Sequence, residues 1–192
     1  MKYLEYATVK RDGDPVGMDA ENKMIESKRL TLAPLYGATN YVARNTSRWL
    51  NDPRTVRYSE QRHLKHTPKS VKLYWRRFNF LTNAIWTISH GRDYIGNISI
   101  DADLNNRTAD IGILIKREAW GKGYATEAWS RLADYLLFER KFHKIEAGCM
   151  ANNAGMIKVF KNCGMKYEGR RVKHFQFAKN KRVDAVYYGK FK

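Results

Sequence analysis

The chain has 192 residues, of which 43% are hydrophobic and 13% aromatic, a composition that favours one domain with an apolar core over a disordered chain. No apolar run approaches the roughly 18 residues of a membrane span, and residues 1–20 lack the apolar segment of a signal peptide. The two cysteines, Cys149 and Cys163, cannot form a disulfide framework, so we expect buried, reduced thiols in a cytoplasmic protein.

The formal net charge is +17 at pH 7. The excess is concentrated at the C-terminus, where residues 169–192 hold eight Lys or Arg against one acid, Asp184. A surface this basic attracts polyanions and steers anionic ligands, nucleic acid among them. The alternative is that the charge only keeps the surface solvated.

The first half of the chain predicts a strand and two helices after an N-terminal extension, residues 1–24. The strand is expected at 25–34. A helix at 36–50 follows and must end before Pro53, which cannot continue it. Thr67 and Pro68 are typical of an N-cap and a first helical residue, and they predict a second helix to about Leu81.

The second half predicts a meander followed by alternating helices and strands. Apolar, β-prone segments at 84–89, 94–101 and 108–115 are separated by turn residues. A helix follows with one apolar stripe, formed by Ala125, Ala128, Trp129, Leu132, Leu136 and Leu137. Next come a strand at 144–150, a helix at 154–162 stopped by Gly164, and basic strands at 167–177 and 182–188. Residues 25–192 therefore predict a single α/β domain.

The segment between the third meander strand and the long helix carries the strongest functional signal. It reads I-G-I-L-I-K-R-E-A-W-G-K-G-Y-A-T-E-A over residues 111–128. A turn through Gly121 and Gly123 into a helix leaves backbone N–H groups open, and with the positive end of the helix dipole they suit a phosphate or pyrophosphate. The glycines let an anion approach the backbone closely, and Lys122 adds a charge. The Rossmann and Walker patterns are both missing.

The stretch W-G-K-G-Y-A-T-E-A resembles the coenzyme A pyrophosphate loop of the GNAT acetyltransferases, in the RimJ/RimL-like branch that acetylates ribosomal-protein N-termini. Trp120 departs from the general pattern at its first position, where Gln or Arg is usual. The segments R-L-T-L and W-L-N-D-P resemble the N-terminal half of the same branch. The resemblance implies a GNAT fold, which is an α/β fold with a mixed, mostly antiparallel sheet and helices on both faces.

The resemblance also implies acetyl-CoA as co-substrate and a set of residues around it. A splayed strand around Ile113 and Ile115 offers backbone N–H groups to the thioester oxyanion. The remaining cofactor-binding residues implied are Trp120, Gly121, Lys122, Gly123, Tyr124, Ala125, Thr126, Asn153 and Phe160. Asn153 matches the Asn that faces the pantetheine arm in the family.

A second motif, A-N-N-A-G-M-I-K-V-F-K-N-C-G-M-K-Y-E-G over residues 151–169, matches the family only in part. Met156 stands where Ser is usual, and Met165 where Phe is usual. Phe160 stands where many members place a Tyr that protonates the departing thiolate. Water can supply that proton, because a thiolate is a tolerable leaving group.

Candidates for the general base are Glu60 and Asp110. Asp110 precedes the loop on its strand, and Glu60 lies in the polar segment Y-S-E-Q-R-H-L-K-H-T (58–67), a region that commonly borders the acceptor pocket in the family. The alternative for that segment is a solvated loop. His63 and His66 lack further ligands for zinc, so no metal site is expected. Glu127 is expected to support the junction between loop and helix.

Two classes of function stay open at this stage. The first is an N-acetyltransferase in which a primary amine attacks the thioester directly. Its acceptor would be a small amine such as a nucleotide-linked amino sugar, or alternatively a protein N-terminal α-amine. The second is a repurposed, basic GNAT fold that binds or modifies nucleic acid. The sequence leaves the oligomeric state and the role of residues 1–24 open.

Overall fold

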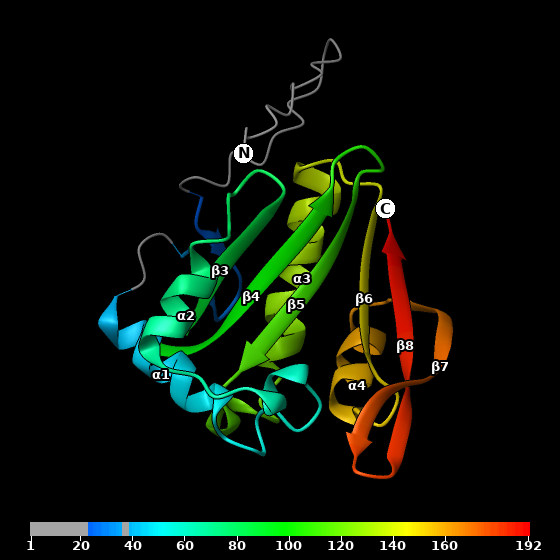
Figure 1. The fold of residues 1–192 in the computed structure, drawn as a ribbon. Helices are drawn as coiled ribbons and strands as arrows, with labels where there is room; N and C mark the ends of the chain where they lie inside the picture. The colour runs from blue at the N-terminus through cyan, green and yellow to red at the C-terminus, as the bar shows by residue number, and fades with distance from the viewer. Residues whose placement is uncertain (1–22, 36–38) are drawn as a thin grey trace, which may run out of the picture.

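The computed structural model describes residues 23–35 and 39–192, and one mixed sheet runs through that part of the chain (Figure 1). The strand order is β1-β2-β3-β4-β5-β6-β8-β7, and neighbours are antiparallel except β5 with β6. The strands are Ile25–Glu26 (β1), Thr31–Pro34 (β2), Asn83–His90 (β3), Asp93–Asp103 (β4), Thr108–Ile115 (β5), Lys144–Met150 (β6), Lys166–Ala178 (β7) and Lys181–Phe191 (β8).

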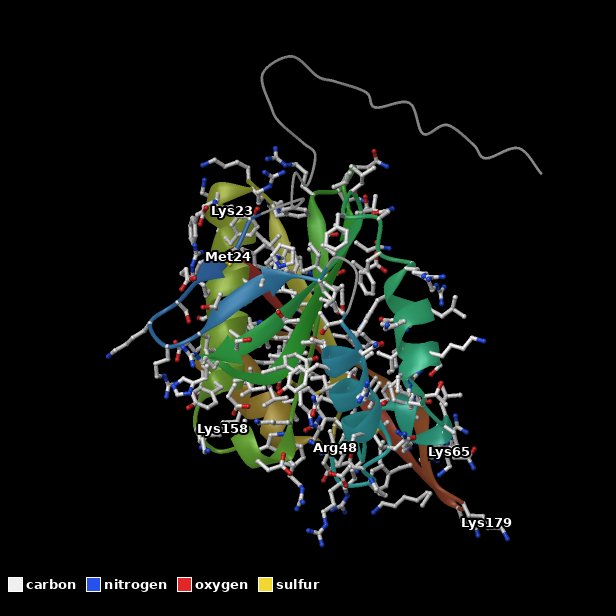
Figure 2. All side chains as sticks on the ribbon, turned by 90° about the vertical axis from the view of Figure 1, so that its left-hand side faces the viewer. Lys23, Met24, Arg48, Lys65, Lys158 and Lys179 are labelled. Carbon is white, nitrogen blue, oxygen red and sulfur yellow. The ribbon has the colours of Figure 1, made fainter. Side chains whose placement is uncertain are left out.

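Helices cover both faces of this sheet. Figures 1 and 2 place α1 and α2 on one face and α3 on the other. α4 packs against α3 through the rings of Trp129 and Phe160, whose centroids are 5.4 Å apart. The expected mixed, mostly antiparallel sheet with helices on both faces is therefore confirmed. The bounds are Asn40–Leu50 (α1), Pro68–Trp75 (α2), Tyr124–Asp134 (α3) and Ala154–Asn162 (α4), with 3-10 turns at Glu60–His63 (η2) and Arg117–Ala119 (η3) and a π turn at Tyr135–Glu139 (η4).

The apolar stripe predicted after the glycine loop forms the centre of the core. Ala128, Trp129, Leu132, Leu136 and Leu137 are all buried, and Ala125 is half-buried at the start of the helix. Burial of this stripe fixes α3 against the sheet, since each large apolar side chain removed from water contributes about 1.5–3 kcal/mol. The position of the glycine loop is thereby fixed as well. No helix in the described ranges is long and apolar enough to cross a membrane.

The single strand predicted at 25–34 is wrong, because the structure divides it into a β1–β2 hairpin. The Ser27 N–H donates to the Leu30 carbonyl oxygen at 2.9 Å, and the Ser27 hydroxyl and the Leu30 N–H are also within hydrogen-bond distance, at 3.1 Å. A serine side chain that bonds the nearby backbone favours a turn over a continuous strand. The hairpin brings residues 27–30 beside the first turn of α3.

The second helix is shorter than predicted, ending at Trp75 and not near Leu81. The Asn79 side-chain oxygen accepts from the N–H groups of Leu81 and Thr82 at 2.8 and 2.9 Å, and Phe80 has a φ of 58°. This Asx turn directs the chain into β3.

The first helix begins at Asn40, after Thr39 as N-cap. Its predicted first residues, 36–38, lie outside the described residues, as do residues 1–22 of the predicted extension.

Candidate active site

The two parallel strands at the centre of the sheet pair only at one end. Thr108–Asp110 of β5 pair with Lys144–Glu146 of β6, and the strands diverge beyond that point (Figure 1). β5 stays paired with β4 as far as Ile115, and β6 stays paired with β8 as far as Met150. The divergence therefore separates two intact ladders and leaves the facing backbone of each strand without a strand partner.

The ladder pattern identifies which peptide groups of β5 face this divergence. The Lys116 N–H donates to the Ile95 carbonyl oxygen at 2.8 Å, so this opposed pair is a hydrogen-bonded one. In an antiparallel ladder, hydrogen-bonded pairs alternate with non-hydrogen-bonded pairs. The residues of the non-hydrogen-bonded pairs point their N–H and C=O groups away from the partner strand, which here is β4. By this alternation, the peptide groups of Ile113 and Ile115 face the side of β6.

The glycine loop follows directly at the open end of the divergence. Gly121 and Gly123 have φ of 75° and 80°, the left-handed region that glycine adopts without a steric penalty. Before them, the Trp120 indole N–H donates to the Ile115 carbonyl oxygen at 2.8 Å, which fixes the start of the loop on the end of β5.

Gly123 is the N-cap of α3, and the first hydrogen bond of the helix runs from the Glu127 N–H to the Gly123 carbonyl oxygen at 3.0 Å. The N–H groups of Tyr124, Ala125 and Thr126 precede that bond. A glycine N-cap has no side chain to satisfy them. The loop therefore presents open N–H donors at the positive end of an 11-residue helix, an arrangement that suits an anion.

Arg29, on the β1–β2 hairpin, holds this loop from outside. Its Nη1 donates to the Lys122 carbonyl oxygen at 3.1 Å, and its guanidinium lies 4.7 Å from the centre of the Tyr124 ring. Its Nε donates to the Glu127 carboxylate at 2.6 Å, and its backbone N–H donates to the same carboxylate at 2.7 Å. Ser27 adds a third hydrogen bond to Glu127, at 2.8 Å.

These contacts put Glu127 at the junction of loop and helix, where the sequence predicts a supporting role for it. Partial burial of the carboxyl group raises its pKa, but the hydrogen bonds from Arg29 and Ser27 outweigh that effect and lower the pKa below its usual value. Glu127 is therefore an ionised anchor at neutral pH.

Arg29→Ala is expected to weaken acetyl-CoA binding about tenfold, because the loop loses the side chain that orients Lys122 and Tyr124. A charge-assisted hydrogen bond contributes roughly 1.5–3 kcal/mol, and partial exposure of Arg29 lowers that figure. Calorimetric titration with acetyl-CoA measures the change. Lys28→Ala is the matched control, since it removes an exposed cation from the same turn. Equal affinities in the two variants would contradict a specific role for Arg29.

Three acids lie side by side across the sheet at the closed end of the divergence. Asp110 is the cross-strand partner of Asp101 on β4 and of Glu146 on β6. Alternation along β4 puts Asp101 on the same face as Asn97, which donates to Thr46 of α1 at 3.2 Å. The acidic row therefore lies on the face of the sheet that α1 and α2 cover.

Asp110, in the middle of this row, has a raised pKa. Although the residue is solvent-exposed as a whole, protein atoms packed around its carboxyl group, and then the charges of Glu146 and Asp101, raise its pKa to about 6. A carboxylate with this pKa accepts protons more readily near neutral pH than an ordinary aspartate does.

Glu60, the other candidate base, is differently placed. It lies in η2, where its carboxylate is 2.9 Å from the Arg62 guanidinium and 3.9 Å from the His63 ring. Its side chain is 57% exposed. The ion pair with Arg62 gives Glu60 a structural role that Asp110 lacks. No group of three or more His, Cys, Asp or Glu in the described residues is arranged to hold a metal ion.

The sequence of this chain matches the model of a known protein family. Residues 29–166, more than half of the chain, match the family model described as "Acetyltransferase (GNAT) domain". The chain belongs to this family.

Among curated relatives, this GNAT domain is 38% identical over 87 residues to "Probable N-acetyltransferase YjcK" of Bacillus subtilis, a match that covers 44% of this chain and 48% of that protein. It is 31% identical over 90 residues to "Uncharacterized N-acetyltransferase p20" of Bacillus licheniformis, covering 47% of this chain and 50% of that one. The matched stretch thus spans about half the length of these relatives.

Solved structures share the fold at low identity. RimJ of Mycobacterium smegmatis with CoA-disulfide has a TM-score of 0.76 at 17% identity, covering 88% of each chain. The microcin C7 self-immunity acetyltransferase MccE, with acetyl-CoA and AMP, has a TM-score of 0.72 at 18%, covering 86% of this chain and 93% of that one. Spermidine N-acetyltransferase of Vibrio cholerae, with CoA and spermine, has a TM-score of 0.73 at 21%, covering 85% and 95%. These likenesses show the fold, and the RimJ/RimL branch is one of several that share it.

The second motif of the GNAT domain lies where β6 leads into α4. Asn153 is the N-cap of α4, and its side-chain oxygen accepts from the Met156 N–H at 3.1 Å. Phe160 is 1% exposed, with its ring packed between Trp129 and Tyr188. Both residues stabilise the position of α4 beside the divergence.

The cysteines of the GNAT domain are buried and free, as predicted. Burial raises the pKa of Cys149 to about 11, and burial also raises that of Cys163. Neither is a thiolate at neutral pH, which agrees with a packing role.

The contacts of two arginines near the site have no signal in the sequence. Arg29 meets Glu127 across 98 residues of chain, and Arg62 meets Gln176 across 114. Local sequence offers no periodic or motif signal for such pairs. The R-L-T-L segment, which contains Arg29, predicts a strand and resembles the RimJ/RimL-like branch, but it does not indicate a contact with the glycine loop.

Proposed function

We propose that this GNAT domain is an acetyl-CoA-dependent N-acetyltransferase that acts on a primary amine. The divergence of β5 and β6 toward a glycine loop at a helix N-terminus carries the proposal. The open N–H donors of Tyr124, Ala125 and Thr126 fit a pyrophosphate, and Gly123 lets it approach the backbone. Lys122, Gly121 and Trp120 complete the loop.

The extended part of the cofactor would lie along the divergence. Ile113 and Ile115 would offer it the peptide groups that turn away from β4. Asn153 and Phe160 would border it from α4. Acetyl-CoA supplies an acetyl thioester, whose carbonyl carbon the amine attacks directly with the CoA thiolate as leaving group.

The residues of the chain would serve this reaction in two ways. A backbone N–H of β5, that of Ile113 above all, would stabilise negative charge on the carbonyl oxygen. Asp110 would accept the proton that the amine loses, because it lies where β5 and β6 part and has a pKa of about 6. Phe160 has no hydroxyl, so water would protonate the thiolate.

We favour a small amine on a phosphorylated carrier, such as a nucleotide-linked amino sugar, as the acceptor. The net charge of +17 supports an anionic partner over a cationic one. A protein N-terminal α-amine is the second candidate. The R-L-T-L and W-L-N-D-P segments favour it, since they resemble the RimJ/RimL-like branch.

The test is calorimetric titration of nucleic-acid-free protein with acetyl-CoA at moderate salt, followed by thiol release with a panel of amines. We expect saturable micromolar binding, and turnover with at least one nucleotide-linked amino sugar or N-terminal peptide. Absence of acetyl-CoA binding would contradict the proposal. Steeply salt-dependent binding of RNA or DNA would then favour a repurposed, nucleic-acid-binding fold.

A further inference from the structure

The loop between α1 and α2 docks onto the tip of the β7–β8 hairpin. The Tyr58 ring stacks on Phe177 with centroids 5.9 Å apart and an interplanar angle of 16°. Arg62 Nη2 donates to the Gln176 carbonyl oxygen at 2.8 Å. Figure 2 shows the labelled Lys65 and Lys179 at one corner of the molecule, where these two segments meet. The docking leaves a half-open cavity of about 270 Å³ between them.

The walls of this cavity combine cations with apolar surface. Arg57, Arg62 and Lys65 line it, together with apolar side chains that include Leu64 and Phe177, and no acidic residue does. We call these five residues the Arg57–Lys65 pocket. A cavity lined this way favours a group that carries negative charge and some apolar surface.

The cations of the pocket are largely uncompensated. Among the described residues, no ion pair involves Arg57 or Lys65, and the Arg57 guanidinium lies 5.3 and 5.9 Å from the ring centres of Tyr58 and Phe177. Arg62 is paired with Glu60, yet its Nε is buried without a hydrogen-bond partner. Arg57 and Lys65 are therefore the two lining cations that an anionic ligand would meet, within the described part of the chain, without a competing carboxylate.

The pocket adjoins the open end of the divergence. Arg62 Nη1 lies 3.8 Å from the sulfur of Met150, the last residue of β6. Met150 lies four positions after Glu146, the cross-strand partner of Asp110, on the same strand. At the rise of a strand these two residues of β6 are on the order of 13 Å apart, with Asp110 beside Glu146 and Arg62 of the pocket beside Met150. A ligand that reaches both is extended, with its anionic group at one end and its amine at the other.

We propose that the Arg57–Lys65 pocket binds a phosphate-bearing part of the acceptor. The substrate class is then an amine carried on a nucleotide or similar phosphorylated carrier. A polyamine is disfavoured, because its cations would face Arg57 and Lys65 without compensating acids. Phe177 and Leu64 would contact the apolar surface of the carrier. This inference rests on the proposed acetyl transfer.

The binding test uses AMP as probe, titrated onto protein already saturated with CoA so that the glycine loop is filled. We expect saturable AMP binding that falls at least tenfold in Arg57→Ala and in Lys65→Ala. Arg54→Ala is the matched control, since it removes an exposed cation of the same loop that does not line the cavity. Arg57 and Lys65 are both exposed, so replacing either with alanine leaves the apolar core intact.

The kinetic test compares a nucleotide-linked amino sugar with the free amino sugar and with spermidine. We expect the nucleotide-linked amine to be the best acceptor, and Arg57→Ala to raise its KM with little change in kcat. Absent AMP binding, equal binding in Arg57→Ala and Arg54→Ala, or a preference for spermidine would overturn the inference. Normal CoA binding and turnover in the same samples would show that acetyl transfer itself stands.

Discussion

Gly123→Trp is expected to abolish acetyl-CoA binding, with a loss of more than a hundredfold in affinity. At Gly123 the backbone has a φ of 80°, and a Cβ there would already lie 3.5 Å from Arg29 Nη2. An indole would fill the space in front of the open N–H groups of α3 and displace the guanidinium that holds the loop. Calorimetric titration with acetyl-CoA, with a melting curve of each sample, measures the effect.

The control for backbone strain is Gly164→Trp. Gly164 has a φ of 74° and open space around its Cβ direction, so it shares the left-handed conformation of Gly123 but not the loop. At either position, a tryptophan held in the left-handed backbone conformation costs about 1–2 kcal/mol of folding free energy. Only Gly123→Trp should lose binding. Undiminished affinity in Gly123→Trp would exclude the loop as the pyrophosphate site.

Asp110→Asn is expected to lower kcat/KM about a hundredfold while acetyl-CoA affinity stays unchanged, since general base catalysis contributes at least that factor. In the unmodified protein the base acts only when ionised. The rate should therefore rise with pH through about 6, the raised pKa of Asp110, and level off above it. The variant should lose this rise. Initial rates of thiol release between pH 5 and 8 measure both effects.

The same substitution should raise stability near neutral pH. The pKa of Asp110 is about 6 in the native state against an ordinary value of 3.8. Between these values the native protein holds a proton that the unfolded chain has released, so the free energy of unfolding falls as pH rises through this window. Asparagine removes that penalty, and a higher melting temperature at pH 7 would separate a lost base from a damaged fold.

Asp101→Asn is the matched control for Asp110. It removes a neighbouring negative charge that raises the pKa of Asp110. The rise of the rate with pH should therefore occur at lower pH, while the rate reached on the plateau is unchanged. Glu60→Gln tests the other candidate base. If Asp110→Asn keeps full activity across this pH range, Asp110 is not the base, and a loss confined to Glu60→Gln would transfer that role to Glu60.

Short-range patterns in the sequence predicted much of the fold. β5 at 108–115, β6 at 144–150 and α4 at 154–162 have the predicted bounds, because strand periodicity and helix stops such as Gly164 involve residues near one another in the chain. The errors arose where a side chain bonds nearby backbone. Ser27 turns the first strand into a hairpin, and Asn79 prevents the second helix from continuing.

The glycine loop could be predicted from the sequence alone, because its anion-binding geometry depends on adjacent residues, two glycines and a helix N-terminus. The candidate site around it could not. The raised pKa of Asp110 depends on burial of its carboxyl group and on its cross-strand neighbours Glu146 and Asp101. The Arg29 contacts and the Arg57–Lys65 pocket likewise join segments distant in sequence. Packing of the sheet, helices and hairpin decides such contacts, and no local pattern encodes them.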